Sequence, residues 1–170
     1  MLPKVLSNFT LYIEGRGYAG VAEEITLPAL EHKTEDYEAA GMAGPVELAL
    51  SLNALKLEFT LGEFNTDVLK QWGLADAGGI NARFLGSAIS EDGGNDEAIE
   101  ISVRGRWKKL DFGTVKKGDR AKLKVEMPLT YYRYSANGVT LIEIDMISGK
   151  QTVSGTDISA VMLQALGITA

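Results

Sequence analysis

The 170-residue chain has no cysteine and a single histidine, His32. The lack of cysteine excludes disulfide bonds and thiolate metal sites. His32 lies among charged residues, where a solvated side chain is far more common than a catalytic base. No run of about 18 apolar residues is present that would cross a membrane as a helix. The N-terminal stretch MLPKVLSNFT meets a polar break too early for a signal peptide. We therefore expect a soluble protein that is not exported by the general secretory route and does not insert into a membrane.

Catalytic machinery is also missing from the sequence. An enzyme needs a nucleophile with a base, a pair of tuned carboxylates, a metal cluster or a cofactor loop, and none can be assembled here. The acids of residues 90–97 lack the order and the closing glutamate of an EF-hand, which favours an exposed hairpin tip over a calcium site. We expect no enzymatic activity, no cofactor and no metal.

Charge is unevenly distributed along the chain. The net charge is -6, yet residues 99–134 carry ten basic and four acidic residues, and the segments on either side are acidic. Two interpretations stay open: a solvated surface whose strands happen to carry lysine, or complementary faces that meet between identical subunits. Under the second interpretation, the candidate contact residues of the basic face are Arg104, Arg106, Lys122 and Lys124.

The same basic segment is the best candidate for nucleic-acid binding, but two features argue against that role. The chain as a whole is acidic, so its long-range attraction for a polyanion is weak or repulsive. Alternation also places Ile101, Val103 and Trp107 on a buried face, which leaves no aromatic platform for stacking bases. A solvated or intersubunit strand face is favoured.

Alternation of apolar and polar residues predicts a mainly β fold. The predicted strands, with a hairpin formed by the first two and another between Val46 and Leu61, lie at 8–14, 18–27, 46–51, 55–61, 80–89, 99–110, 120–134 and 139–147. An Asn-Gly turn joins the last two strands. Period-two spacing puts Leu129 and Tyr131 on the buried face, and Pro128 marks an edge or a bulge.

Two helices are predicted. The internal one covers 66–74, with Asn65 as its N-cap and an apolar stripe that includes Val68 and Trp72. A second helix near the C-terminus is capped by Thr156 or Asp157. Because this helix is short and terminal, residues 156–170 are expected to dock on a neighbouring surface.

A long connection runs from Pro28 to Pro45 in an otherwise economical chain that is predicted to form one domain over residues 1–170. Connections in compact domains usually span only a few residues, so this charged and poorly periodic loop calls for a role outside the domain. Assembly is the expected role. Tyr37 and Met42 are its candidate anchors, because large apolar groups in a polar loop usually bury against something.

Sequence motifs spread over the whole chain resemble one protein family. In order, they are a strand followed by LP-x-L, a run with KTEDY, AGM-x-G and VEL, then RG at 104–105, KKLD at 108–111, TYYR at 130–133, EID at 143–145 and VSGTD at 153–157. This order resembles the major tail tube proteins of contractile-tailed bacteriophages and R-type pyocins.

The resemblance implies a tail-tube fold, a β-sandwich or barrel-like subunit that gives strands to an intersubunit β-barrel. It implies hexameric rings stacked into a hollow tube inside a contractile sheath. The implied partners are further copies of the chain, the sheath protein, and the tape measure, tail terminator and baseplate proteins. DNA would pass without specific binding. The implied location is the virion tail, assembled in the bacterial host cytoplasm.

Within that architecture, a wall that lets DNA pass must not hold it, so its strands should be acidic or mixed in charge. The first candidate for the wall is the hairpin between Val46 and Leu61, whose lumen candidates are Glu47, Ser51, Lys56, Glu58 and Thr60. The second is the pair of strands from Ile80 to Leu110. On the outer surface, the candidate sheath contacts are Glu23, Glu24 and Asp67.

Two other functions stay open. One is the tube of a DNA-free contractile injection system, either pyocin-like or of the type VI secretion kind. The other is a carbohydrate- or cell-surface-binding β-sandwich, which would need clustered exposed aromatic residues. Tyr131, Tyr132 and Tyr134 form the only such cluster in the sequence, and alternation assigns Tyr131 to the buried face.

Overall fold

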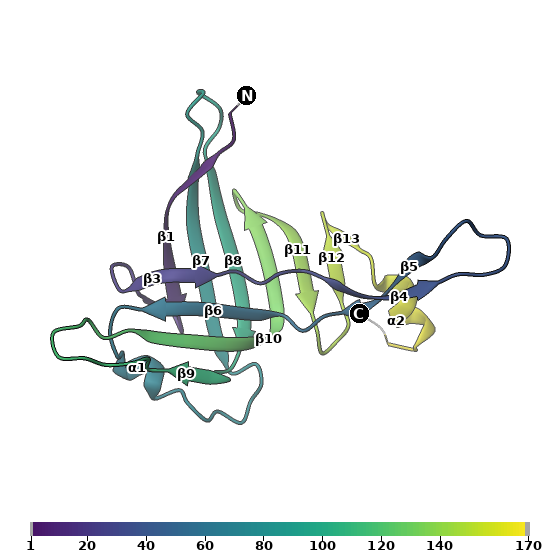
Figure 1. The fold of residues 1–170 in the computed structure, drawn as a ribbon. Helices are drawn as coiled ribbons and strands as arrows, with labels where there is room; N and C mark the ends of the chain where they lie inside the picture. Colours follow the sequence, from purple (N-terminus) through teal and green to yellow (C-terminus); the bar gives the residue numbers. More distant parts are fainter. Residues whose placement is uncertain (1, 169–170) are drawn as a thin grey trace.

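The computed structural model describes residues 2–168 and consists mainly of β-strands, as predicted (Figure 1). One large sheet has the strand order β13-β12-β11-β10-β8-β7-β1-β2. Its strands are β1 (Val5–Ile13), β2 (Arg16–Gly17), β7 (Ile80–Ile89), β8 (Glu97–Gly105), β10 (Leu123–Ala136), β11 (Val139–Asp145), β12 (Gln151–Val153) and β13 (Thr156–Asp157).

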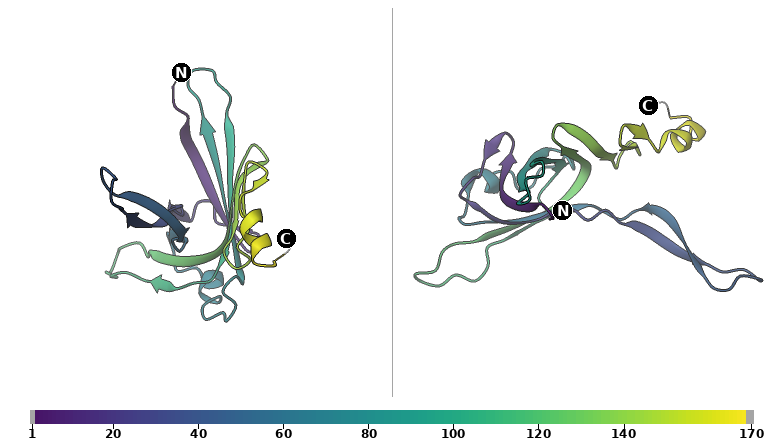
Figure 2. Two further views of the ribbon diagram at one scale, coloured as in Figure 1. Left: turned by 90° about the vertical axis from the view of Figure 1, so that its right-hand side faces the viewer. Right: turned by 90° about the horizontal axis from the view of Figure 1, so that it is seen from above.

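A small sheet crosses one face of the large sheet. It consists of β3 (Ala22–Thr26), β6 (Lys56–Leu61), the first half of β10, and β9 (Lys109–Asp111). The two remaining strands, β4 (His32–Tyr37) and β5 (Val46–Leu52), pair only with each other. They project from one end of the body, and the loop between β9 and β10 projects from the other (Figure 2).

Strand β10 belongs to both sheets because it bends in its middle. Residues 123–128 pair with β6, and residues 129–136 pair with β8. A register shift between Leu129 and Tyr131 confirms the bulge predicted near Pro128, although the strand lies inside the sheets and not at an edge. The bulge reverses the alternation, so Tyr132 is buried and Tyr131 lies on the other face. The predicted burial of Tyr131 was therefore wrong.

The core lies between the two sheets. Alternate residues of both layers are buried there, including Leu11, Phe59 and Val125. The predicted buried face of Ile101, Val103 and Trp107 is confirmed, since each of these residues is at most 5% exposed. The indole N–H of Trp107 donates to the carbonyl oxygen of Val68 at 3.0 Å, which satisfies its one polar atom inside the core.

Helix α1 (Thr66–Leu69) is shorter than predicted. The N-cap is confirmed, because the Asn65 side chain accepts hydrogen bonds from the backbone N–H groups of Asp67 and Val68. Val68 is buried, but Trp72 lies beyond the helix and is 54% exposed. The C-terminal helix, α2 (Ala160–Ala165), has Ser159 as its N-cap, and the predicted cap residues Thr156 and Asp157 form strand β13 instead.

Strand pairing corrects three sequence predictions. Residues 22–26 pair with β6 and not with β1, so the first hairpin stops after β2. The predicted strand 99–110 is broken after Gly105 into β8 and β9. The predicted hairpin between Val46 and Leu61 does not form, because β5 pairs with β4 and β6 pairs with β3 and β10. By contrast, strand 80–89 and the Asn-Gly turn between β10 and β11 are confirmed.

Candidate assembly surfaces

The segment predicted as a long loop is part of a projecting β-ribbon, here called the arm (residues 31–52). The backbone N–H of Asn53 donates to the carbonyl oxygen of Glu31 and closes the base of the arm. Residues 32–37 form a strand despite their charge, because they pair with the apolar-alternating β5. The sequence thus contained the strand signal of β5, but not the identity of its partner.

The two faces of the arm differ in character. Tyr37 lies opposite Val46, and Glu35 lies opposite Leu48, so these side chains share one face. Tyr37, Val46 and Leu48 are 52%, 47% and 46% exposed, which is unusual for side chains of their size. The other face carries Asp36 directly opposite Glu47. A two-stranded ribbon with an uncovered apolar face is marginally stable alone and is typical of an element that a partner covers.

The tip of the arm contains the second predicted anchor. Met42 is half-buried, and its sulfur accepts a hydrogen bond from the backbone N–H of Ala39 at 3.2 Å. Met42 therefore folds back onto its own turn, whereas Tyr37 is available to a partner. Both assignments as intersubunit contacts remain predictions.

The predicted basic face is divided between two surfaces. Arg104 lies on the large sheet with its guanidinium 4.2 Å from the centre of the Tyr131 ring. Arg106 donates to the carbonyl oxygen of Ala75 at 3.1 Å and so holds the segment after α1. Lys124, on the small sheet, lies opposite Thr60 of β6 and Asp111 of β9. These cations therefore do not form one continuous patch.

The candidate sheath contacts have different surroundings. Glu23 forms ion pairs with Arg120 at 2.5 Å and with Lys122 at 3.9 Å. Asp67 pairs with Arg16. Glu24 is exposed on β3 and lies opposite Thr60. Of the three carboxylates, only Glu24 has no ion-pair partner within the described part of the chain.

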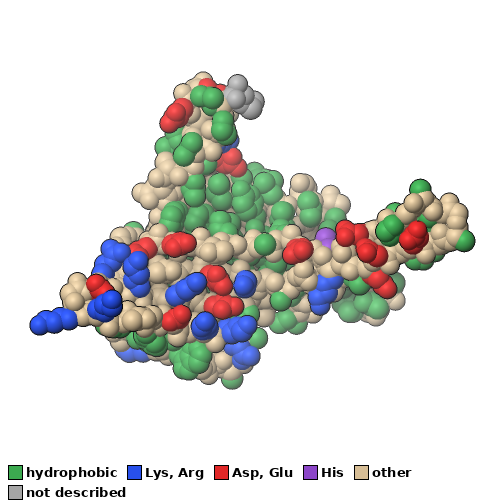
Figure 3. Space-filling view, viewed as in Figure 1, with side chains coloured by type: hydrophobic (Ala, Val, Ile, Leu, Met, Phe, Trp, Pro, Cys, Tyr) green, Lys and Arg blue, Asp and Glu red, His purple; other side chains and the backbone are tan. Residues whose placement is uncertain are grey.

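The five lumen candidates do not share a face. Glu47 and Ser51 lie on the arm, while Lys56, Glu58 and Thr60 lie on the outer face of the small sheet. That outer face also carries the sheath candidate Glu24, beside mixed charges that Figure 3 shows along the crossing strands. One surface cannot face both the interior of a tube and its sheath. Glu24 as a sheath contact is therefore incompatible with Lys56, Glu58 and Thr60 as lumen residues.

A second mixed-charge surface, here called the polar face, covers the side of the large sheet that points away from the core. On strands β7, β8, β10 and β11 it carries three arginines and three carboxylates, namely Arg83, Glu100, Arg104, Arg133, Glu143 and Asp145. Glu100 lies between Arg83 at 3.7 Å and Arg133 at 3.8 Å. Burial raises the pKa of the neighbouring Tyr131, and Glu143 raises it further. The positive and negative charges on these four strands balance.

Sequence reasoning did not name most of these residues, although it chose strands 80–110 as the second candidate for a wall. The alternation in the sequence did indicate part of this face, because Arg83, Glu100 and Arg104 occupy the polar positions of β7 and β8. Their partners Arg133 and Glu143 are placed beside them only by the bulge in β10 and by the pairing with β11.

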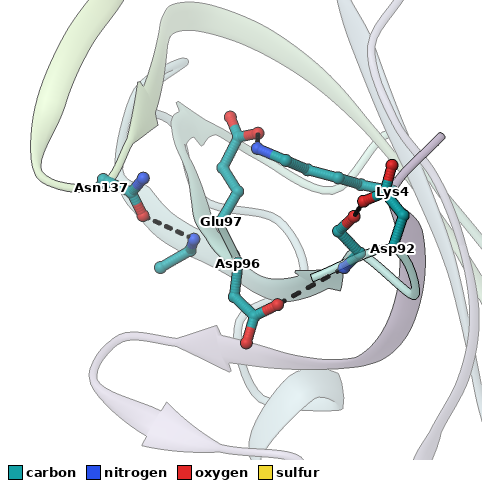
Figure 4. A network of polar contacts seen from close by, with 7 residues as sticks. Lys4, Asp92, Asp96, Glu97 and Asn137 are labelled. Atoms are coloured by element: carbon teal, nitrogen blue, oxygen red, sulfur yellow. Dashed lines mark hydrogen bonds and ion pairs between the residues drawn. The ribbon is translucent and has the colours of Figure 1, made fainter. Parts of the chain in front are cut away.

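Polar contacts join the start of β8, next to the β7–β8 tip, to the segment before β1 and to the β10–β11 turn (Figure 4). The Lys4 ammonium lies 2.9 Å from a carboxylate oxygen of Glu97, and Asn137 accepts from the backbone N–H of Ala98. Within the tip, Asp96 accepts from the backbone N–H of Ser90. These acids are thus structural parts of a hairpin tip. Across residues 2–168, no three His, Cys, Asp or Glu side chains gather as metal ligands, and no helix is long and apolar enough to span a membrane.

Comparison with known proteins identifies the family. A family model described as phage tail tube protein FII matches residues 3–167. The chain belongs to this family. It is 39% identical over 161 residues to the tail tube protein of Escherichia phage P2, covering 92% of each chain. It is 34% identical over 149 residues to the major tail tube protein of Serratia phage KSP20, covering 86% of this chain and 85% of that one.

Solved structures share the fold of this tail tube protein. A chain of the anti-feeding prophage tube-terminating cap aligns with a TM-score of 0.60 at 10% identity, over 79% of this chain and 92% of that one. A chain of the sheath-tube complex of the PVC extracellular contractile injection system gives 0.58 at 11% identity, with the same coverages. The family is structural, in agreement with the expected absence of catalytic machinery.

Proposed function

We propose that this tail tube protein forms six-membered rings that stack into the inner tube of a contractile phage tail, through which the genome passes. Membership of the family supports the role of a tube subunit. The free edge of β1 supports assembly with neighbouring copies. Within the described chain, β1 pairs with β7 along one side, but residues 5–10 have no strand on the other side. Such a long open edge favours aggregation unless another strand pairs with it. Closing the large sheets of neighbouring subunits into one barrel removes these edges.

The polar face would then line the lumen. The opposite face of the large sheet packs on the core and the small sheet covers it, so the polar face is the side of that sheet available to an interior channel. Glu100 pairs with Arg83 and Arg133, and Glu143 and Asp145 add two further carboxylates to the same face as Arg104. A neutral wall releases few counterions to passing DNA and therefore retains it weakly.

The outer face of the small sheet would meet the sheath, with Glu24 as the available carboxylate and Glu23 and Asp67 engaged in pairs within the subunit. Tape measure, tail terminator and baseplate proteins complete the proposed partners, and assembly takes place in the host cytoplasm. A DNA-free tube is the less favoured alternative, because both relatives described above are phage proteins.

Electron microscopy of concentrated purified protein tests this function directly. We expect stacked rings with sixfold symmetry and tubes of variable length. A variant in which a short Gly-Ser linker replaces residues 32–52 should give a folded subunit that does not extend into tubes, because the arm is lost and the body remains. A monodisperse wild-type monomer at high concentration and low salt would overturn the proposal.

A further inference from the structure

The arm is strongly acidic and its charges are unsatisfied. Residues 31–52 contain five acids and one lysine, a net charge of -4. Asp36 and Glu47 lie directly opposite each other in the ribbon, and like charges in that position destabilise a strand pair. No acid of the arm has an ion-pair partner within the described residues. The arm thus carries a local electrostatic cost that a cationic partner would remove.

A basic loop lies at the opposite end of the subunit. Here called the basic loop, residues 112–122 contain four cations and one acid, a net charge of +3. Arg120 and Lys122 share the single carboxylate of Glu23. Lys116 and Lys117 have no ion-pair partner in the described part of the chain. Cationic charge is therefore in excess on this loop, as the blue side chains at its end in Figure 3 show.

The basic loop also offers apolar surface. Phe112 and Val115 are 45% and 67% exposed, and together with Arg120 and Lys122 they line a depression of about 490 Å³. The arm also carries exposed apolar side chains together with acids: Tyr37 and Val46 share one face of the ribbon with Glu35, and Asp36 and Glu47 lie on the other face. The two elements are thus complementary in both charge and polarity.

We propose that the acidic arm of one subunit docks on the basic loop of a second copy of this chain. The two elements project from opposite ends of the body, which makes contact within one chain impossible in this conformation (Figures 1 and 2). Two different surfaces that meet head to tail form a heterologous interface, which generates closed rings or open helical stacks. This inference rests on the proposed tube assembly and names the receiving surface of the arm.

Charge reversal and its compensation test the proposal. Asp36→Lys with Glu47→Lys on the arm, or Lys116→Glu with Lys117→Glu on the basic loop, should each raise the critical concentration for tube formation by about tenfold or more. Combining all four substitutions in one chain should restore assembly to within about threefold of wild type, because attraction is re-established with the signs exchanged. Sedimentation of tubes measures each value.

A matched control separates this contact from general charge effects. Glu63→Lys with Glu91→Lys changes the net charge by the same amount as the arm pair, on exposed side chains outside the arm and basic loop, and should leave the critical concentration nearly unchanged. Circular dichroism verifies that each variant folds. Failure of the fourfold variant to assemble, when each pair alone blocks assembly, would overturn the proposal, as would normal tubes from either pair.

Because the chain has no cysteine, a disulfide between two introduced cysteines tests the contact between the arm and the basic loop independently. Tyr37→Cys and Val115→Cys, introduced in separate chains and mixed under oxidising conditions, should form a covalent dimer, whereas Tyr37→Cys with Thr156→Cys should not. If removal of the arm abolishes tubes but charge reversal and cross-linking have no effect, the tube function stands and this inference fails. If tubes form without the arm, the role proposed for the arm in assembly fails first.

Discussion

Gly105 lies where β8 passes closest to the bend in β10. A Cβ atom at this position would collide with the carbonyl oxygen of Pro128, which is backbone and cannot rotate away. We expect Gly105→Ala to lower the free energy of unfolding by roughly 3 kcal/mol or more, as overpacking against fixed atoms does. Denaturant unfolding measures the change.

Gly44 provides the matched control for that substitution. It lies in the arm, and an added Cβ would meet nothing within 4 Å. Gly44→Ala should therefore leave the unfolding free energy within about 0.5 kcal/mol of wild type. Equal stability of the two variants would mean that the close approach of β8 and β10 is relaxed in solution.

Asp157 gives the C-terminal segment a dependence on pH. Its carboxylate accepts hydrogen bonds from the Ser159 side chain at 2.6 Å and from the Ser159 backbone N–H at 2.9 Å, and these bonds lower the pKa of Asp157 below its ordinary value. Because the folded-state pKa is the lower one, the stabilisation is present above the ordinary pKa and is lost as pH falls through the folded value.

We expect faster amide exchange at Ser159 and Leu163 as pH falls through that range, after correction for the intrinsic exchange rate. The Ser159 hydroxyl also accepts from the backbone N–H of Gln151, so the loss should loosen α2 from β12. Asp157→Asn keeps a neutral acceptor and should remove the pH dependence. A pH dependence that persists in Asp157→Asn would assign it to another group.

Single residues also show where sequence alternation stops being informative. Period-two spacing is correct along β10 as far as Leu129 and then assigns Tyr131, instead of Tyr132, to the core. One extra residue in the ladder is enough to exchange the two faces of the strand. Pro128 indicated an irregularity in the strand, but its position did not indicate which of the following residues would face the core.

At the scale of elements, the sequence indicated where strands lie more reliably than which strands pair with each other. The alternation of β5 and β6 was read correctly, yet proximity in sequence suggested that they pair with each other. The charged residues of β4 lack the apolar alternation that marks a strand, so the true partner of β5 was taken for a loop. Every residue of β4 is exposed, so the strand buries no face within the subunit and lacks the usual signal.

Strand β3 carries the proposed contact with the sheath. Glu24→Lys should weaken binding of sheath subunits to preformed tubes, more at low salt, because an exposed carboxylate acts through a screened interaction. Cosedimentation of sheath with tubes over a range of salt concentrations measures the effect. Glu31→Lys on the arm is the control with the same charge change, and it should leave sheath binding unchanged on tubes that have already formed. Equal sheath binding by Glu24→Lys and wild-type tubes would mean that this carboxylate contributes to solubility and not to the sheath contact.

At the scale of the whole molecule, the family could be inferred from sequence although several strand pairings could not. Motifs in a fixed order span the chain from LP-x-L to VSGTD, and their order is independent of which strand lies next to which. The location of the lumen depends on pairing. We propose the polar face, and not residues 46–61, as the lumen wall because β5 and β6 belong to different sheets.

Two substitutions with the same charge change distinguish the candidate walls. Glu143→Lys places its charge on the polar face, and Glu58→Lys places it on the outer face of the small sheet. Each adds about twelve positive charges to a six-membered ring, and a wall with that excess binds DNA through counterion release. If the polar face lines the tube, phage particles carrying Glu143→Lys should assemble but eject their genomes slowly, with the delay shrinking as salt increases. Particles carrying Glu58→Lys should eject at the wild-type rate. The reverse outcome would place the small sheet inside the tube and return Lys56, Glu58 and Thr60 to the lumen.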